Sequence, residues 1–456
     1  MKHTTTAVMP AAATKLASRT RWTILTILFI VTTINYADRA SISIAGPEIR
    51  KALGLSPVEM GFVFSAFAWS YVAAQLPGGW LLDRFGSKIT YFFSIFLWSL
   101  FTMLTGAVGF LSGAAAVGAL FVLRFAVGAA EAPSFPGNSR ITSAWFPTHE
   151  RGLASALFNS AQYFATVIFA PLMGWLVHAF GWQSVFVVMG GLGIALAFVW
   201  LKVIHGPKDH PSVSAGELKY IEEGGALVDL DGAKRHAQPP AVDTLACVKE
   251  LLGNRMLLGV YIGQYCINTL TYFFLTWFPV YLVQERHMTI LKAGFVASLP
   301  AIAGFLGGVC GGAISDRLAK AGFSLSLSRK VPIVAGMLLS MSMVACNYIE
   351  GDTFVVAVMA LAFFGKGVGA LGWAVVADTS PKEAGGLSGA LFNTFGNIAG
   401  ITTPIVIGYI LQGTGSFAGA LVYVGANAAV TIFSYVFIVG EIKRVKLVKS
   451  LRTAAP

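Results

Sequence analysis

The chain has 456 residues, of which 56% are hydrophobic and 12% charged, and its mean hydropathy is +0.71. Soluble domains carry about 25% charged residues, so this composition excludes an ordinary soluble protein and predicts a chain that crosses a membrane several times. The formal net charge of +11 would also suit a nucleic-acid-binding protein, so the positions of the basic residues must decide between these classes.

The apolar segments predict an all-α membrane protein of twelve transmembrane helices in two six-helix halves, because one span needs about 20 mainly apolar residues. The predicted spans are 22–45, 60–82, 90–109, 114–136, 151–178 and 182–204 in the first half, and 256–284, 291–314, 331–349, 353–378, 385–412 and 416–440 in the second. The halves are therefore 22–204 and 256–440, flanked by cytoplasmic tails at 1–21 and 441–456. The central cytoplasmic loop is 205–255, in which 217–225 is either a short surface helix or a solvated linker.

The basic residues follow the positive-inside rule. If the N-terminus is inside, most of the 32 basic residues fall in the tails and the cytoplasmic loops. Four fall outside (Arg50, Lys51, Arg286 and Lys292) and three fall within spans (Arg39, Arg124 and Lys366). The charge therefore needs no nucleic-acid partner. The four cysteines are scattered without metal-ligand spacing, and we expect neither a metal nor a cofactor.

The two halves resemble each other at an offset of 233 or 234 residues. The tripeptide at 61–63 recurs at 294–296, and Asp83-Arg84 recurs as Asp316-Arg317. Internal repeats of this kind build transporters whose binding site lies near the bilayer midplane, between the halves.

Five charged residues fall well inside the predicted spans, away from the span ends. Arg124 and Glu131 are seven residues apart in the fourth span, which places them on one helix face about 10 Å apart. Asp38 and Arg39 lie late in the first span, and Lys366 takes the repeat-related place of Glu131 to within one residue. Charges at membrane depth normally face a water-filled cavity, so we expect the two acids and three bases to share one cavity. The alternative is a buried structural ion pair between the first span and Arg124 or Glu131.

The charge of this site predicts an anionic substrate. It carries +1 with both acids ionised and +3 with both protonated, so proton and anion binding should be coupled. A dianion entering a cell against 100 mV faces about twice 2.3 kcal/mol, and two accompanying protons would cancel that cost.

Polar residues on neighbouring spans could bind substrate hydroxyl groups, although each alone could equally be an interhelical contact. Trp373 follows Lys366 by seven residues and is expected on the same helix face. The other candidates are Tyr71, Gln75, Asn159, Gln162, Thr166, Asn393 and Asn397.

The repeated acid-base pairs Asp83-Arg84 and Asp316-Arg317 lie at predicted cytoplasmic ends of spans. They are either topology signals alone or gating latches between helices of each half, and we favour the latch.

Several motifs resemble a known family. GGWLLDRFGSK (78–88) resembles the loop 2-3 signature of the major facilitator superfamily, and INYADRASISIAG, RFAVGAAEAPSFPGNSR and NSAQYFATVIFAP are similar to its anion:cation symporter branch. The similarity is strongest to bacterial D-glucarate and D-galactarate transporters, including ALAFFGKGVGALGWAVVADTSPKE in the second half.

This resemblance implies roles for individual residues. It implies that Asp38 and Glu131 couple protons, and that the substrate site is lined by Arg39, Tyr71, Arg124, Gln162, Trp373 and Asn393. Relatives that carry the monocarboxylate galactonate look neutral where this chain has Lys366, which favours a diacid substrate.

Together these observations predict a proton-coupled symporter for D-glucarate and D-galactarate that works by alternating access. We expect a monomer in the bilayer of the bacterial cytoplasmic membrane, with both termini in the cytoplasm. Symport of a monocarboxylate such as D-galactonate and exchange of organic anions remain alternatives. A membrane enzyme is disfavoured because the chain has no HExxH, no GxSxG and no Cys/His cluster.

Overall fold

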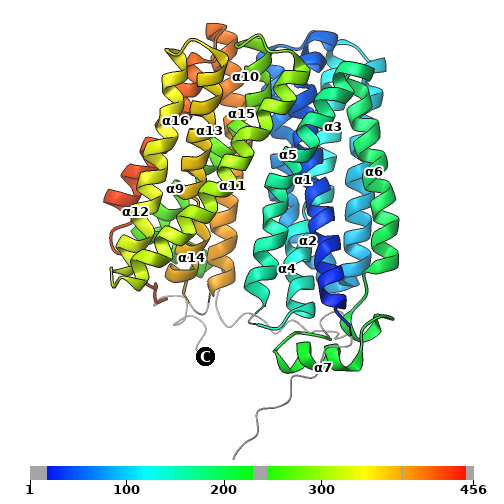
Figure 1. Ribbon diagram of the computed structural model, residues 1–456, viewed down its shortest axis with the longest axis vertical. Coiled ribbons are helices and arrows are strands. Elements are labelled where there is room, and N and C mark those ends of the chain that lie inside the picture. Colours follow the sequence, from blue (N-terminus) through cyan, green and yellow to red (C-terminus); the bar gives the residue numbers. More distant parts are fainter. Residues whose placement is uncertain (1–17, 149, 230–243, 382–383, 448–456) are drawn as a thin grey trace, which may run out of the picture.

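The computed structural model describes residues 18–148, 150–229, 244–381 and 384–447. Within these ranges the fold is helical without strands, and the helices form two bundles that stand side by side (Figure 1). The bundle built from residues up to 204 is called the N half, and the bundle built from residue 255 onward is called the C half. This arrangement confirms the predicted fold class.

The helices of the N half follow the predicted spans. They are α1 (Thr20–Leu53), α2 (Pro57–Thr105), α3 (Gly113–Glu131), α4 (Ser134–Trp145), α5 (Arg151–Phe180) and α6 (Trp182–Val203). The long α2 contains two spans, because Gly86 adopts φ 77° and ψ 166° and breaks the helix. Glycine takes a positive φ without the steric penalty that a side chain would bring.

The C half contains more interruptions. Its elements are α9 (Arg255–Tyr272), η3 (Phe273–Trp277), α10 (Phe278–Gln284), α11 (Ile290–Lys320), α12 (Leu325–Ser340), η4 (Met341–Asn347), α13 (Asp352–Val368), α14 (Gly372–Thr379), α15 (Gly385–Thr414), α16 (Ala418–Phe433) and η6 (Ser434–Ile438). Ten of the described helical stretches are long and apolar enough to cross a membrane. Two further passes complete the twelve. One is α1, whose apolar run is interrupted by Asn35, Asp38 and Arg39, and the other is the part of α2 that precedes Gly86.

The fourth and tenth passes are broken at equivalent places. In the fourth pass, α3 ends at Glu131 and α4 begins at Ser134; in the tenth, α13 ends at Val368 and α14 begins at Gly372. The break in the fourth pass follows directly after Glu131, and the break in the tenth begins two residues after Lys366. The prediction that Lys366 and Trp373 share one helix face is therefore wrong, because the helix does not continue between them.

The two halves pack closely at the end of the molecule opposite to α7 (Ala215–Glu223), which we call the far end (Figure 1). A Cβ on Gly61 of α2 would lie 2.6 Å from the Pro404 carbonyl oxygen of α15. A Cβ on Gly294 of α11 would lie 2.8 Å from the Ala170 carbonyl oxygen of α5. Because these glycines are repeat-related, the same small residue permits a close helix approach on both sides of the interface.

Polar contacts also join the halves at the far end. The Ser43 hydroxyl donates to the Thr276 carbonyl (2.6 Å), and the Arg50 guanidinium donates to Gln284 Oε1 (2.7 Å). Toward the opposite end, called the α7 end, the ribbons of the bundles diverge (Figure 1). The molecule is thus closed at the far end.

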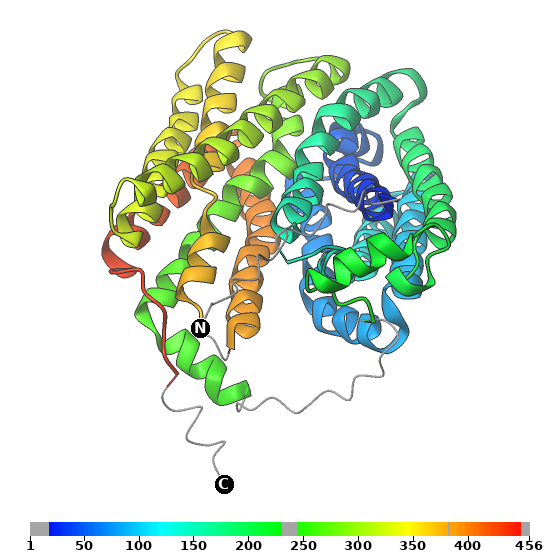
Figure 2. The ribbon, with the colours of Figure 1, turned by 60° about the horizontal axis from the view of Figure 1, so that its bottom comes forward.

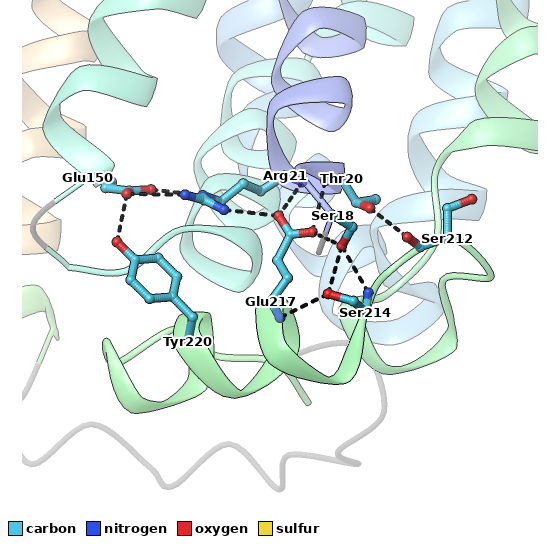
Figure 3. Close-up of polar contacts among 8 residues, drawn as sticks. All are labelled: Ser18, Thr20, Arg21, Glu150, Ser212, Ser214, Glu217 and Tyr220. Atoms are coloured by element: carbon cyan, nitrogen blue, oxygen red, sulfur yellow. Dashed lines mark hydrogen bonds and ion pairs between the residues drawn. The ribbon is translucent and has the colours of Figure 1, made fainter. Parts of the chain in front are cut away.

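The central segment docks on the N half through a buried carboxylate (Figure 3). The first turn of α1 has no side-chain cap of its own. Glu217 of α7 accepts hydrogen bonds from the backbone N–H of Thr20 (2.9 Å) and Arg21 (3.2 Å) and from the Ser18 hydroxyl (2.5 Å). A carboxylate at this place satisfies unpaired N–H groups and complements the helix dipole, so α7 caps α1 in trans.

An ion-pair network extends this contact to α5. The Arg21 guanidinium pairs with Glu217 (3.0 Å) and with Glu150 (3.0 Å), and the Tyr220 hydroxyl donates to Glu150 (2.9 Å). Figure 2, in which the α7 end comes forward, shows α7 lying across the N half. The open question about 217–225 is thereby settled in favour of a helix, although Glu217 itself is fully buried. Because α1 carries Asp38 and Arg39, this network fixes the helix that positions the candidate site.

We expect Glu217→Gln to lower the melting temperature of the purified protein, because breaking a buried ion pair costs roughly 3–5 kcal/mol in the general case. Burial acts to raise the pKa of Glu217, but the donors from Ser18, Thr20 and Arg21 outweigh it and hold that pKa below its ordinary value. A carboxylate with a lowered pKa stabilises the fold at pH values above its ordinary pKa. This contribution disappears as the pH falls through the lowered pKa. The difference between wild type and variant should therefore be full at pH 7 and shrink as the pH falls below the ordinary glutamate pKa of about 4.3.

The matched control is Glu223→Gln on the same helix. Glu223 pairs with Lys219, and the two side chains are 69% and 75% exposed, respectively. Such a surface pair contributes little, so this variant should melt like the wild type. Equal melting temperatures for all three proteins at pH 7 would contradict the capping role of Glu217.

Candidate functional site

The centre of the N half is an ion pair between α1 and α3. Arg39 Nε lies 2.8 Å from Glu131 Oε2, and these side chains are 9% and 0% exposed. Glu131 is the last residue of α3, where the carbonyl end of the helix dipole disfavours an anion, and Arg39 offsets this. The ion pair that the sequence left open as an alternative is therefore present.

Aromatic rings surround the Arg39 guanidinium. Its carbon lies 4.6 Å from the ring centroid of Phe67 and 4.9 Å from those of Tyr36 and Tyr71. These distances allow cation–π attraction, so the rings hold the cation in place while leaving some of its N–H donors free for a ligand. Tyr71, a predicted substrate residue, is thus placed against Arg39.

Arg124 ties α3 to the backbone of α1. Its guanidinium donates to the carbonyl oxygens of Asp38 (3.3 Å) and, at a longer distance, Arg39 (3.5 Å). Both oxygens of the Asp38 carboxylate are buried without a hydrogen-bond partner among the described residues, as is the indole N–H of Trp98. Glu131 Oε1 is unpaired in the same way. Buried polar atoms are normally paired, so these gaps mark places where a proton, water or ligand can bind.

A cavity lies between the two halves. Tyr36, Gln162 and Lys366 line it, and most of its remaining wall is apolar. The other polar residues of the lining are Ser43, Tyr163, Thr166 and Thr271. An apolar wall with a few polar groups is the usual chemistry of small-molecule sites.

Lys366 is the charged residue of this cavity wall. Its side chain is buried, and its ammonium lies 5.1 Å from the Phe363 ring centroid. Within the described ranges no carboxylate lies within ion-pair distance of Lys366. A buried cation without a counter-ion is costly, so this position favours an anionic ligand.

The structure divides the predicted site residues into two groups. Gln162 and Lys366 line the cavity, whereas Asp38, Arg39, Tyr71, Arg124 and Glu131 form a cluster beside it. Tyr36 belongs to both, because it lines the cavity and contacts Arg39. The expectation that all five charges line one cavity is thus not met in this conformation, since Arg39 and Glu131 are bound to each other.

The two remaining predicted residues lie elsewhere. Trp373 on α14 is 57% exposed, and its ring packs edge-on against Phe392. Asn393 of α15 donates to Gln75 Oε1 of α2 (3.2 Å) and so joins the two halves. Asn393 is also hydrogen-bonded to Asn397, which accepts from the Tyr272 hydroxyl (3.0 Å).

Sequence reasoning missed several of these groups. Tyr36 could have been found, because it precedes Arg39 by three residues and so shares its helix face. Tyr163, Thr271 and Tyr272 gave no signal, since their importance depends on which helices of the two halves meet.

The predicted gate residues lie at the α7 end. Asp83 pairs with Arg140 of α4, and Arg84 lies 5.5 Å from the Trp80 ring centroid. Asp316 and Arg317 at the end of α11 are exposed.

The C half has a different ion pair at this end, which the sequence did not indicate. Arg329 of α12 binds Asp378 of α14 (2.8 Å) and Ser315 of α11 (2.9 Å). No cluster of three or more metal-ligating side chains occurs in the part of the chain that the structure describes.

Solved structures support the architecture. A D-xylose-proton symporter matches with a TM-score of 0.70 at 13% identity, covering 93% of this chain and 99% of that one. A bacterial homologue of the human lysosomal transporter Spinster, inward-facing and unoccupied, matches with a TM-score of 0.67 at 17% identity, covering 93% and 95%. At these identities the likeness shows the fold alone.

Sequence relatives are much closer. The probable galactarate/D-glucarate transporter GudP of Escherichia coli (strain K12) is 63% identical over 438 residues, covering 96% of this chain and 97% of that protein. The protein of the same name from Bacillus subtilis (strain 168) is also 63% identical, covering 98% of each chain. The D-galactonate transporter of Escherichia coli O6:H1 is 42% identical and covers 96% and 99%. The model of the Major Facilitator Superfamily matches residues 28–404, and the chain belongs to that superfamily.

Proposed function

We propose that this chain is a proton-coupled symporter that imports the hexarate diacids D-glucarate and D-galactarate by alternating access. Relatives that are 63% identical over nearly their whole length bear the name of galactarate/D-glucarate transporters. The observation in this chain that carries the proposal is Lys366, a buried cation in the wall of the cavity between the halves that has no counter-ion among the described residues.

Lys366 in the cavity wall and Arg39 in the cluster beside the cavity suit a substrate with two carboxylates. Lys366 of the C half binds one carboxylate, and Arg39 of the N half, with Arg124 behind it, binds the other. Gln162 lies in the same wall and contacts the hydroxyl groups between them. Trp373 and Asn393 complete the site when the halves approach each other at the α7 end.

Glu131 and Asp38 carry the coupled protons. In the structure Glu131 pairs with Arg39, so it competes with a substrate carboxylate for the same cation. A proton on Glu131 neutralises this competitor and frees Arg39 for the substrate. Asp38 is the second carrier, because both of its oxygens are buried without a donor and the ionised form is costly in such a place.

The α7 end is the cytoplasmic end in this proposal, so both termini are cytoplasmic. Asp83 with Arg84, and Asp316 with Arg317, act as latches at that end when the carrier closes inward. The protein works as a monomer in the bacterial cytoplasmic membrane, with the N half (22–204) and C half (256–440) moving against each other. The predicted loop (205–255) links them, with α7 attached to the N half.

Two related transport modes are the alternatives. A D-galactonate transporter is 42% identical, which leaves symport of a monocarboxylate as the second candidate. Lys366 favours the diacid, because a monocarboxylate would leave this cation unpaired. Exchange of organic anions without proton movement is the third.

In proteoliposomes with an inward proton gradient alone, the wild type should accumulate labelled D-glucarate. Asp38→Asn with Glu131→Gln should reduce this accumulation at least tenfold, because the neutral side chains carry no proton. Counterflow of D-glucarate should persist in this double variant and shows that the protein is folded. If the double variant accumulated D-glucarate as well as the wild type does, the proton-carrying role would be contradicted. If the proton gradient drove no accumulation by the wild type, the protein would be an exchanger.

Lys366→Gln should shift the preference from diacid to monocarboxylate. A hydrogen bond to a charged group contributes about 1.5–3 kcal/mol, so we expect D-glucarate uptake to weaken about tenfold or more. The measurement is competition of labelled D-glucarate uptake by D-galactarate and by D-galactonate. Lys366→Arg should keep the diacid preference, as should Lys292→Gln, whose lysine pairs with Asp352 at the far end. Unchanged competition in Lys366→Gln would show that Lys366 does not read the second carboxylate.

A further inference from the structure

We propose that the C half carries a binding site for the headgroup of an anionic phospholipid at the α7 end. The site is a groove between the start of α9 and the segment that follows η6. It is lined by Asn254, Arg255 and Met256 on one side and by residues 437–441 and 443–446 on the other. Figure 2 shows this C-terminal segment, in red, along the outer edge of the C half.

The groove is strongly basic. Arg255, Lys443, Arg444 and Lys446 line it and are all exposed, whereas Glu441 is its single acid. Glu441 pairs with Lys443 at 3.2 Å, with both side chains 72% exposed, so that pair is readily exchanged for another anion. Four cations and one carboxylate leave three net positive charges for a ligand.

The backbone around these cations is held in place. The N–H of Val445 donates to the Thr379 carbonyl (2.8 Å), and the N–H of Ile442 donates to the Ser326 hydroxyl (2.7 Å). Arg255 donates to the Phe437 carbonyl (2.9 Å). A guanidinium has five N–H donors, so Arg255 can close the groove and still bind a phosphate. The cations therefore belong to a formed groove.

An apolar surface continues from the groove along the outside of the bundle. Phe433 and Phe437 are 55% and 62% exposed with ring centroids 5.0 Å apart, and Val436 between them is 46% exposed. Phe437 also lines the groove itself. A ligand that matches both parts has acyl chains for the apolar surface and a negative headgroup for the cations. Free phosphate has no group for the aromatic surface, so charge and shape favour the lipid.

Native mass spectrometry of the purified full-length protein tests this site. We expect the wild type to retain palmitoyl-oleoyl phosphatidylglycerol in preference to phosphatidylcholine with the same acyl chains. In Lys443→Gln with Lys446→Gln, the affinity for phosphatidylglycerol should fall about 30-fold, since each basic residue near an anionic lipid contributes roughly 1 kcal/mol. An unchanged melting temperature shows that the variant is folded.

The matched control removes the same charge from the N half. Lys208→Gln with Lys219→Gln should retain phosphatidylglycerol like the wild type, although its net charge equals that of the groove variant. Equal losses in both double variants would show a general charge effect, and equal retention of both lipids by the wild type would show no headgroup recognition. Displacement of the lipid by millimolar inorganic phosphate would identify a site for free phosphate. Each of these three results overturns the proposal.

Discussion

The ion pair between Arg39 and Glu131 is the contact on which the rest of the site depends. It joins α1 to the end of α3, and neither side chain has more than slight access to solvent. Removing one partner of such a buried pair strongly destabilises the protein, because the other charge is left buried and unpaired. The intact pair nevertheless adds little stability compared with apolar residues in its place. Its presence at the centre of the N half therefore points to use in the transport cycle, because one partner can be neutralised by a proton and the other can take a substrate anion.

The surrounding structure holds this pair in place. The rings of Phe67 and Tyr71 fix the guanidinium, and Arg124 fixes the α1 backbone beside it. Glu217 caps the start of the same helix from the central segment. The C half supplies the complementary feature, since Lys366 has no acid within ion-pair distance among the described residues. The repeat has thus given rise to a paired charge in one half and an unpaired one in the other, at the same place before a helix break.

Much of this could be predicted from the sequence, because hydropathy and the positive-inside rule act locally. The apolar runs gave the twelve passes, and charges inside apolar spans are rare enough to indicate Asp38, Arg39, Arg124, Glu131 and Lys366. Contacts between the halves could not be predicted, because they depend on which faces meet. The Gln75–Asn393 bond and the place of Tyr272 are examples.

Helical spacing misled in one place. The run from Lys366 to Trp373 contains no proline, so continuous helix was the natural expectation, but glycines permit the break between α13 and α14. The repeated acid-base motifs have different surroundings in the two halves, because Asp83 pairs with Arg140 whereas Asp316 and Arg317 are exposed. The repeated motifs thus lie at equivalent positions in the two halves, but the contacts that they make differ.

The most direct test of the exchange between proton and substrate is the pH dependence of D-glucarate binding to purified wild type and Glu131→Gln. If protonation of Glu131 frees Arg39, the wild type binds more tightly as the pH falls, and the variant binds at pH 8 about as tightly as the wild type at low pH. A variant that keeps the pH dependence of the wild type, or that binds more weakly at every pH, would contradict the account.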